Sequence, residues 1–190
     1  SFRQIIGTDG DEAQRLQFAD LNGMLLAEIT ELKYSTYVTA NLGGQATYLQ
    51  LAVDYTGDGL QDDRLFFEPV YQTGGYGGTS VPDQCPGIYN CVALNTWQTW
   101  DALTGGWWLE SVSGGPPLIT LADFVVAHPN VSLVSGGFAF RIQAGGGAGA
   151  WDNFDGYVDN LTVNGTTWDL ELIINTVWVD DDYTAATPGW

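Results

Sequence analysis

Six aromatic residues in this chain have types and positions that could build a surface for stacking on a flat ligand. Four tryptophans lie between positions 97 and 108, and a fifth lies at 151, beside glycine-rich or loop-like segments. Aromatic faces with polar side chains beside them are suited to binding sugar rings. The predicted ligand-binding residues are Trp97, Trp100, Trp107, Trp108, Trp151 and Tyr76. The alternative is that the tryptophans belong to the core, because large aromatic side chains are usually buried.

The spacing of the tryptophans limits how many of them one core can bury. Side chains alternate between the two faces of a strand, so Trp97 and Trp100, at an odd spacing, would point to opposite faces. Trp107 and Trp108 are adjacent and cannot both face the same core. Part of the set is therefore expected outside the core.

An acidic segment between two apolar runs has the residue types of a calcium loop. Asp54, Asp58 and Asp62 supply carboxylates at even spacing, and Gly59 stands where a sharp turn would fall. Leu65 occupies the position at which a calcium loop needs a bidentate glutamate. A solvated hairpin turn is the alternative. If calcium binds here, the three aspartates are the predicted ligands.

Residues for catalysis are few. His128 is the only histidine, and its place at the end of a predicted helix is more typical of a C-terminal cap than of a catalytic triad. Glu68 and Glu110 could in principle serve as the acid and base of a glycosidase, but nothing in their spacing pairs them. We therefore expect a protein that is not an enzyme.

The two cysteines, Cys85 and Cys91, bracket a turn-rich segment that could bring them within bridging distance. A disulfide is the favoured interpretation, and it would indicate an oxidising compartment. Two free buried thiols are one alternative. Half of a metal site is the other, although the chain has no further cysteine and a single histidine.

Composition and charge exclude several functions. The 190 residues carry 23 Asp and Glu against five Lys and Arg, a net charge of −18, which repels nucleic acid and anionic membranes. No segment approaches the roughly 20 apolar residues of a membrane-spanning helix, so we expect no membrane insertion. The 25 glycines, together with many Thr, Val and Tyr residues, favour strands joined by tight turns. The expected fold is one all-β sandwich.

Alternation of apolar and polar residues predicts most of the strands. They cover 1–7, 14–19, 31–39, 47–55, 64–71, 97–101, 131–134, 137–143 and 156–163, and the first two could form a hairpin. Thr120 and Asp123 resemble a capping box, which predicts one short helix over 120–128. The segment 72–96 is a long ordered loop. Residues 1–175 are assigned to the sandwich, and 176–190 to an acidic linker or an added strand.

Five segments in order resemble a poorly characterised module of secreted bacterial multidomain proteins. They are "ITELKYSTYV", "DGLQDDRLFFEPVY", "WQTWDALTGGWW", "TLADFVVAHPN" and "GAWDNFDGYVDNLTV", and together they cover nearly the whole chain. The resemblance implies a jelly-roll β-sandwich in a secreted or surface protein, without assigning a ligand.

The strand "GYVDNL" is also similar to the last core strand of jelly-roll carbohydrate-binding modules. In those modules the acidic residue of this strand commonly binds a structural calcium with oxygens from the N-terminal turn. The resemblance therefore implies calcium ligands at Asp159 and at Asp9 or Asp11.

These observations lead to two functional hypotheses. The first is a non-catalytic carbohydrate-binding module with a structural calcium, whose partner is a glycan. The second is a structural or adhesive surface module that binds a surface protein or associates with its own copy, because an unpaired strand in the tail could add to an exposed sheet edge.

Overall fold

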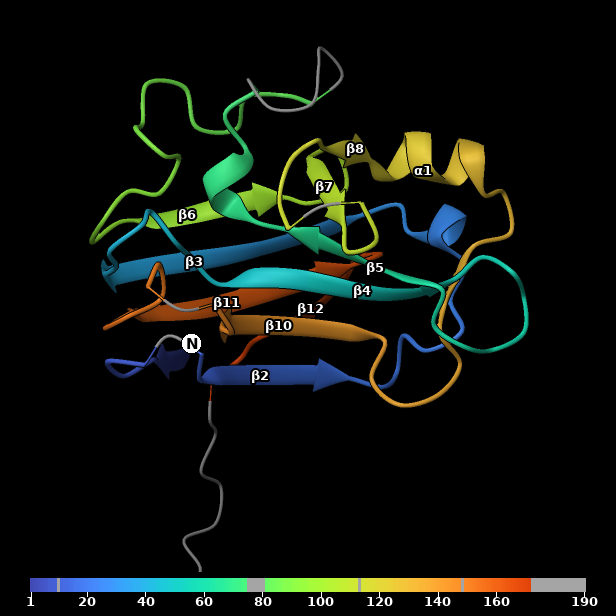
Figure 1. Ribbon diagram of the computed structural model, residues 1–190, viewed down its shortest axis with the longest axis horizontal. Coiled ribbons are helices and arrows are strands. Elements are labelled where there is room, and N and C mark those ends of the chain that lie inside the picture. Colours follow the sequence, from blue (N-terminus) through green and yellow to red (C-terminus); the bar gives the residue numbers. More distant parts are fainter. Residues whose placement is uncertain (10, 75–80, 113, 148, 172–190) are drawn as a thin grey trace, which may run out of the picture.

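The computed structural model describes residues 1–9, 11–74, 81–112, 114–147 and 149–171. Its strands form two antiparallel sheets that pack face to face, with one short α-helix at the side of the sandwich (Figure 1). The predicted all-β sandwich with a single short helix is therefore confirmed. The predicted acidic linker or added strand, 176–190, lies outside the described residues.

The larger sheet has seven strands, and six of them follow one path. Their order is β2 (Ala13–Phe18), β10 (Phe140–Gly145), β4 (Tyr48–Asp54), β5 (Asp63–Phe67), β7 (Gly106–Leu109) and β8 (Ile119–Thr120), with β9 (Ser132–Leu133) pairing with β4. As predicted, β4 and β5 form a hairpin around the acidic segment. A single-turn 3-10 helix, Pro69–Tyr71, follows β5.

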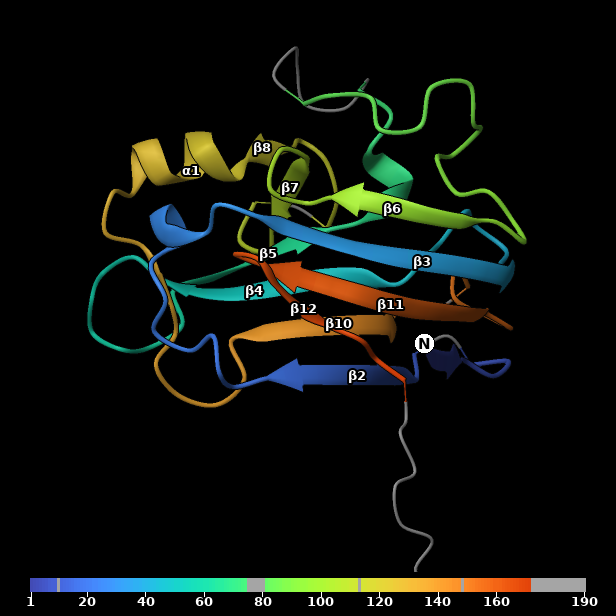
Figure 2. The ribbon, with the colours of Figure 1, turned by 180° about the vertical axis from the view of Figure 1, so that it is seen from behind.

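The smaller sheet has five strands and is seen best from behind (Figure 2). Its order is β1 (Phe2–Ile5), β11 (Asp155–Val163), β3 (Leu32–Ala40) and β6 (Trp97–Asp101), with β12 (Thr166–Trp168) pairing with β11. Strand β3 alternates as the sequence indicated, and Leu32 and Tyr34 are fully buried against the larger sheet. Another single-turn 3-10 helix, Leu26–Glu28, precedes β3 and is the first 3-10 turn along the chain, so Pro69–Tyr71 is the second.

The first two strands do not form the hairpin that the sequence allowed. Strand β1 pairs with β11, and β2 pairs with β10, so the two strands belong to different sheets. Gln4 and Gln14 join them through side-chain hydrogen bonds instead, from Gln4 Nε2 to the Gln14 carbonyl at 3.0 Å and from the Ile5 amide to Gln14 Oε1 at 3.2 Å. The turn therefore carries the chain from one layer of the sandwich to the other.

The single helix, α1 (Leu121–Ala127), begins and ends where its sequence signals lie. Thr120 Oγ1 accepts a hydrogen bond from the Asp123 amide at 3.1 Å and donates to the Asp123 carboxylate, which confirms the predicted cap. His128 is the C-terminal cap, and Pro129 follows it. Among the described residues, no helix is long and apolar enough to cross a bilayer.

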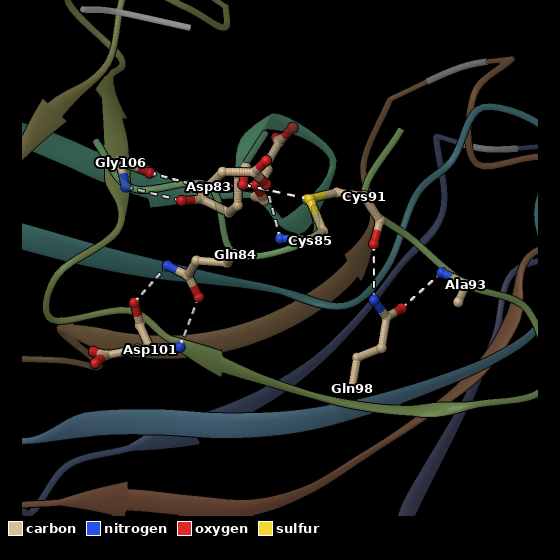
Figure 3. Close-up of a disulfide and its surroundings, with 10 residues drawn as sticks. Asp83, Gln84, Cys85, Cys91, Ala93, Gln98, Asp101 and Gly106 are labelled. Carbon is tan, nitrogen blue, oxygen red and sulfur yellow. Dashed lines mark hydrogen bonds between the residues drawn. A yellow bond between two sulfur atoms is a disulfide. The ribbon is translucent and has the colours of Figure 1, made fainter. Parts of the chain in front are cut away.

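The long loop after the second 3-10 turn is held to the sandwich by a disulfide and by glutamine side chains (Figure 3). The disulfide joins Cys85 and Cys91, as favoured from the sequence. Three glutamines bond to backbone groups through both the oxygen and the nitrogen of the side-chain amide: Gln72 with Gly106, Gln84 with Asp101, and Gln98 with Cys91 and Ala93. Backbone groups that would otherwise lack partners are thus satisfied, and the described part of the loop is tied down.

Candidate functional site

The structure does not bring the predicted tryptophans together on one surface. Trp100 and Trp107 are 1% and 0% exposed and pack between the sheets, so neither can contact a ligand. Trp97 points the other way from β6 and is 47% exposed, which confirms that Trp97 and Trp100 face opposite sides. Trp108 and Trp151 belong to a separate cluster beyond the larger sheet. Tyr76 lies outside the described residues.

The outer face of the larger sheet, turned away from the core, is recessed. Every residue of β4 is buried, including Tyr48, Gln50 and Asp54, which alternate with the core-facing Leu49 and Leu51. Side chains on an open sheet face would be exposed at such alternate positions. A cavity of about 430 Å³ opens on this side of the sheet.

We call this cavity the outer pocket, and five neighbouring strands, β2, β10, β4, β5 and β7, supply its floor. Its polar and aromatic lining residues are Arg15, Tyr48, Gln50, Arg64, Phe66, Glu68, Trp108, Glu110, Arg141, Gln143 and Trp151. They come together because Gln143 pairs with both Arg15 and Tyr48 across the sheet, and Phe66 pairs with both Gln50 and Trp108. The register thus collects residues that are far apart in the sequence.

Aromatic side chains form one side of the outer pocket. Phe66 and Trp108 are stacked with their ring centres 3.9 Å apart and their planes 3° from parallel. Tyr48 lies 6.3 Å from Phe66 and 5.5 Å from Trp151, centre to centre. The four rings therefore make a continuous apolar wall beside the polar groups of β4 and β10.

A hydrogen-bonded network fixes the polar side of the pocket. Gln143 Oε1 accepts from Arg15 Nε at 2.6 Å and from Gln50 Nε2 at 2.9 Å. Gln143 Nε2 and the Tyr48 hydroxyl both donate to the Gly145 carbonyl, at 3.0 and 2.9 Å. Side chains held in this way present their remaining polar atoms in defined positions.

Four buried side-chain polar atoms have no hydrogen-bond partner among the described residues, and all four line the outer pocket. They are Gln50 Oε1, Arg64 Nε, Trp108 Nε1 and Arg141 Nε. Buried polar atoms are rarely left unpaired, because each one costs about 1–3 kcal/mol. One acceptor and three donors on residues that line the pocket are therefore left unpaired within the described part of the chain.

The outer pocket is a positively charged site in an acidic chain. Arg15, Arg64 and Arg141 are three of only five Lys and Arg residues in the sequence. Arg64 pairs with Glu110 at 3.3 Å, whereas Arg141 has neither a hydrogen bond nor an ion pair within the part of the chain that the structure describes. Burial, with repulsion from Arg64 and Arg15, lowers the pKa of Arg141.

Glu68 is the second carboxyl of the pocket, and its surroundings favour the protonated form. Burial raises the pKa of Glu68 from its ordinary value of 4.5 to about 7. The nearby Trp108 indole N–H opposes this effect by favouring the charged form, although it does not meet the geometry of a hydrogen bond. Near neutral pH, the pocket therefore contains one paired carboxylate, one half-protonated carboxyl and three arginines.

The carboxyls of Glu68 and Glu110, considered above as a glycosidase pair, line the same pocket without facing each other. The Glu110 amide donates to the Arg64 carbonyl, so Glu110 lies at the start of β5. Glu68 follows the end of β5, beyond the stacked Phe66 and Trp108. In the sheet register, the aromatic pair therefore lies between the backbone positions of the two glutamates. His128 is remote from this pocket and stacks on Tyr55 at 4.5 Å.

The aspartates of the acidic turn bind their own backbone. The Asp54 carboxylate accepts from the amides of Gly57 and Gly59 at 2.6 and 2.7 Å. Asp62 accepts from Tyr55 and Thr56, and Asp58 from Leu60. These contacts match the solvated hairpin turn. Within the described residues, no three His, Cys, Asp or Glu side chains cluster as a metal site.

The residues suggested as a second calcium site lie apart. Phe2 pairs with Val158 and Ile5 with Asp155, so the chain leads away from Asp159 before it reaches Asp9 and Asp11. Asp9 accepts a hydrogen bond from the Asp11 amide at 3.2 Å, in a turn of its own. Asp159 accepts from the amides of Asn160 and Leu170. Calcium therefore stays a prediction from the sequence, and these residues are not brought together.

Two other hollows lack the features of the outer pocket. The larger, about 640 Å³, lies between the first 3-10 turn and α1 and is mainly apolar, and its Thr120 and Asp123 bond to each other. The other is a shallow surface over Tyr37, Trp97 and Tyr157 on the smaller sheet. None of the four unpaired buried atoms lies in either one.

Comparison of the chain with family models, with curated proteins and with solved structures finds no match. The function therefore has to be argued from the outer pocket itself. Most of its residues were not predicted. The sequence did contain one signal for this pocket. Three of the five basic residues fall on strands, at positions that alternate with core residues and therefore face away from the core.

Proposed function

We propose that this chain is a non-catalytic carbohydrate-binding module whose binding site is the outer pocket. The observation that carries the proposal is the convergence of four unpaired buried polar atoms beside an aromatic wall. A sugar has apolar ring faces and hydroxyl groups that both donate and accept. It is therefore a ligand that can contact such a wall and satisfy such atoms together.

The polar atoms match the chemistry of sugar hydroxyls. Gln50 Oε1 can accept a hydrogen bond, while Trp108 Nε1 and Arg64 Nε can donate. The glutamine network holds Gln50 and Gln143 in place before a ligand arrives, which lowers the ordering cost of binding. Binding to preset atoms next to flat rings is the way in which concave sites fix the orientation of small ligands.

Binding, not hydrolysis, is the activity that the pocket supports. Glycosidases place two carboxyl groups about 5–10 Å apart on either side of the bond to be cleaved, with space for a sugar between them. In the outer pocket, the stacked Phe66 and Trp108 lie in the sheet register between the backbone positions of Glu68 and Glu110. We accordingly assign Glu68 and Glu110 to a binding site, Glu68 as a buried carboxyl of its wall and Glu110 as an exposed partner of Arg64.

Secretion is part of the proposal and is supported by the Cys85–Cys91 disulfide, since such bonds persist in oxidising compartments. Glycans are abundant partners there for a protein with a net charge of −18, which discourages non-specific contacts with other anionic surfaces.

A glycan array with parent and variant proteins tests the proposal. Trp108→Ala opens the aromatic wall and should remove at least tenfold in affinity for any glycan that the parent binds. Trp97→Ala is the matched control on the opposite side of the sandwich and should bind like the parent. If the alanine variant is unfolded by circular dichroism, Trp108→Phe keeps a ring but removes the indole donor.

Two outcomes distinguish a failure of the proposed function from a failure of the proposed site. A parent that binds nothing on a broad array contradicts the function. Loss of binding in Trp97→Ala with full binding in the Trp108 variant places the ligand on the smaller sheet and contradicts the site.

A further inference from the structure

We propose that the glycan bound by the outer pocket is anionic, with a carboxylate or sulfate group held by Arg141 together with Arg15 and Arg64. The inference rests on the proposed function and adds the class of ligand. Its basis is a cluster of cations that the protein itself leaves incompletely paired.

Arg141 is the central observation. It pairs in register with Gln50 on one side and Gln17 on the other, so no acidic residue stands opposite it in the sheet. Its guanidinium has no hydrogen bond or ion pair to any described residue, and its buried Nε is unsatisfied. The chain has 23 acidic residues that could have paired with it. In a chain with so many acidic residues, a partly buried arginine without a partner is suited to bind an anion from outside the protein.

The other two arginines are oriented toward the same cavity by neighbours that leave part of each guanidinium free. Gln143 holds Arg15 through Nε. Gln61 and Glu110 hold Arg64 through its two terminal nitrogens, and its Nε stays unpaired. All three line the outer pocket. Their mutual repulsion, which contributes to the lowered pKa of Arg141, would be relieved by an anion.

Guanidinium groups are suited to this task because their planar fork matches the two oxygens of a carboxylate or sulfate. A neutral sugar would satisfy single donors but would leave the repulsion among the arginines in place. The carboxyls that face this cluster oppose an anion only in part: Glu110 is paired with Arg64, and burial favours the neutral form of Glu68.

The test uses two matched pairs of ligands in isothermal titration calorimetry with the full chain. Trigalacturonate is compared with its methyl ester, and a sulfated galactose trisaccharide with its desulfated form. In each pair the sugar rings and linkages are the same, and the members differ at the group that carries the charge. At least one anionic form should bind about tenfold or more tightly than its neutral partner, as expected for charge-assisted hydrogen bonds. The pair that shows the difference identifies carboxylate or sulfate as the recognised group.

Arg141→Gln provides the variant arm, with Lys33→Gln as the control on the smaller sheet. Arg141→Gln should lose about tenfold or more in affinity for the anionic ligand and clearly less for the neutral ligand, so the preference for the anionic member of the pair should largely disappear. Because the charge it removes is unpaired, the ligand-free variant should melt at the same temperature as the parent or higher. A merely structural arginine would show the opposite shift.

Three results would overturn the inference. They are equal binding of both members in each pair, full binding by Arg141→Gln, and no binding of any of the four ligands by a parent that binds neutral glycans on the array. In these cases the proposed glycan binding still stands. Both proposals are contradicted only if the parent binds none of the four ligands in calorimetry and no glycan on the array.

Discussion

Glu68 illustrates how burial at a single residue couples the outer pocket to pH. Its pKa is raised from 4.5 to about 7, so the folded chain holds this proton more tightly than the unfolded chain does. The stability that protonated Glu68 contributes is therefore complete below about pH 4.5 and is lost as pH rises through 7.

Glu68→Gln tests this coupling. At pH 8 the variant should be more stable than the parent by about 2–3 kcal/mol, since glutamine avoids burying a charge, and the two should converge near pH 4. Urea unfolding at both pH values measures the difference. Glu110→Gln is the control, because Glu110 is exposed and should change stability by less than about 1 kcal/mol. A constant difference between Glu68→Gln and parent at both pH values would contradict the assignment.

The adjacent Trp107 and Trp108 have different roles, and substitution should separate them. Trp107 is fully buried between the sheets, so Trp107→Ala should lower the free energy of unfolding by about 3–5 kcal/mol. Trp97→Ala, at an exposed ring, should cost less than about 1 kcal/mol. Chemical denaturation compares the two. Equal costs would show that the core is not where the structure places it.

At the scale of elements, local alternation predicted most of the strands but missed two short ones, β7 and β8. The partners of β1 and β2 could not be predicted from alternation, because alternation does not specify which strand is the neighbour. The same limit explains the site. Arg15, Tyr48 and Arg141 lie on three strands from different parts of the sequence, and only the sheet order brings them together.

For the tryptophans too, local spacing predicted the face of the strand but not what surrounds that face. Odd spacing correctly placed Trp97 and Trp100 on opposite faces of a strand. It could not tell which outward face would be recessed, because that depends on the loops that reach over each sheet. Glycine-rich segments around 114 and 146–147 reach the outer pocket, and neither had a recognisable role in the sequence.

The acidic turn between β4 and β5 should be stable without a metal, because its carboxylates cap backbone amides. Asp54→Ala removes two such hydrogen bonds at a buried site and should cost about 2–3 kcal/mol. Asp58→Ala, at an exposed site with one bond, should cost less than about 1 kcal/mol. Removal of calcium with EDTA should leave the melting temperature of the parent unchanged. A fall of several degrees would instead support the calcium site predicted from the sequence.

The disulfide loop is expected to be a local clamp. Replacing Cys85 and Cys91 with alanine opens a loop with a sequence separation of 6, which in the chain-entropy model costs about 2 kcal/mol. Gln84 and Gln98 keep their backbone contacts, so the variant should still unfold cooperatively in urea. A variant that fails to fold at 25 °C would show that the disulfide holds the whole domain.

At the scale of the whole molecule, charge is distributed unevenly. The chain has a net charge of −18, yet three of its five basic residues line the outer pocket. Anions approaching elsewhere are repelled, so an acidic glycan would gain its affinity from short contacts inside the pocket and not from long-range attraction. This arrangement favours selectivity over tight non-specific binding.

The most direct test of glycan binding at the outer pocket is a nuclear magnetic resonance titration of the side-chain N–H groups. The glycan is one selected on the array. Binding at the outer pocket should shift the Trp108 indole and the Arg141 Nε–H signals to saturation and leave the indoles of Trp97, Trp100 and Trp107 in place. Shifts at Trp97 with none at Trp108 or Arg141 would contradict it.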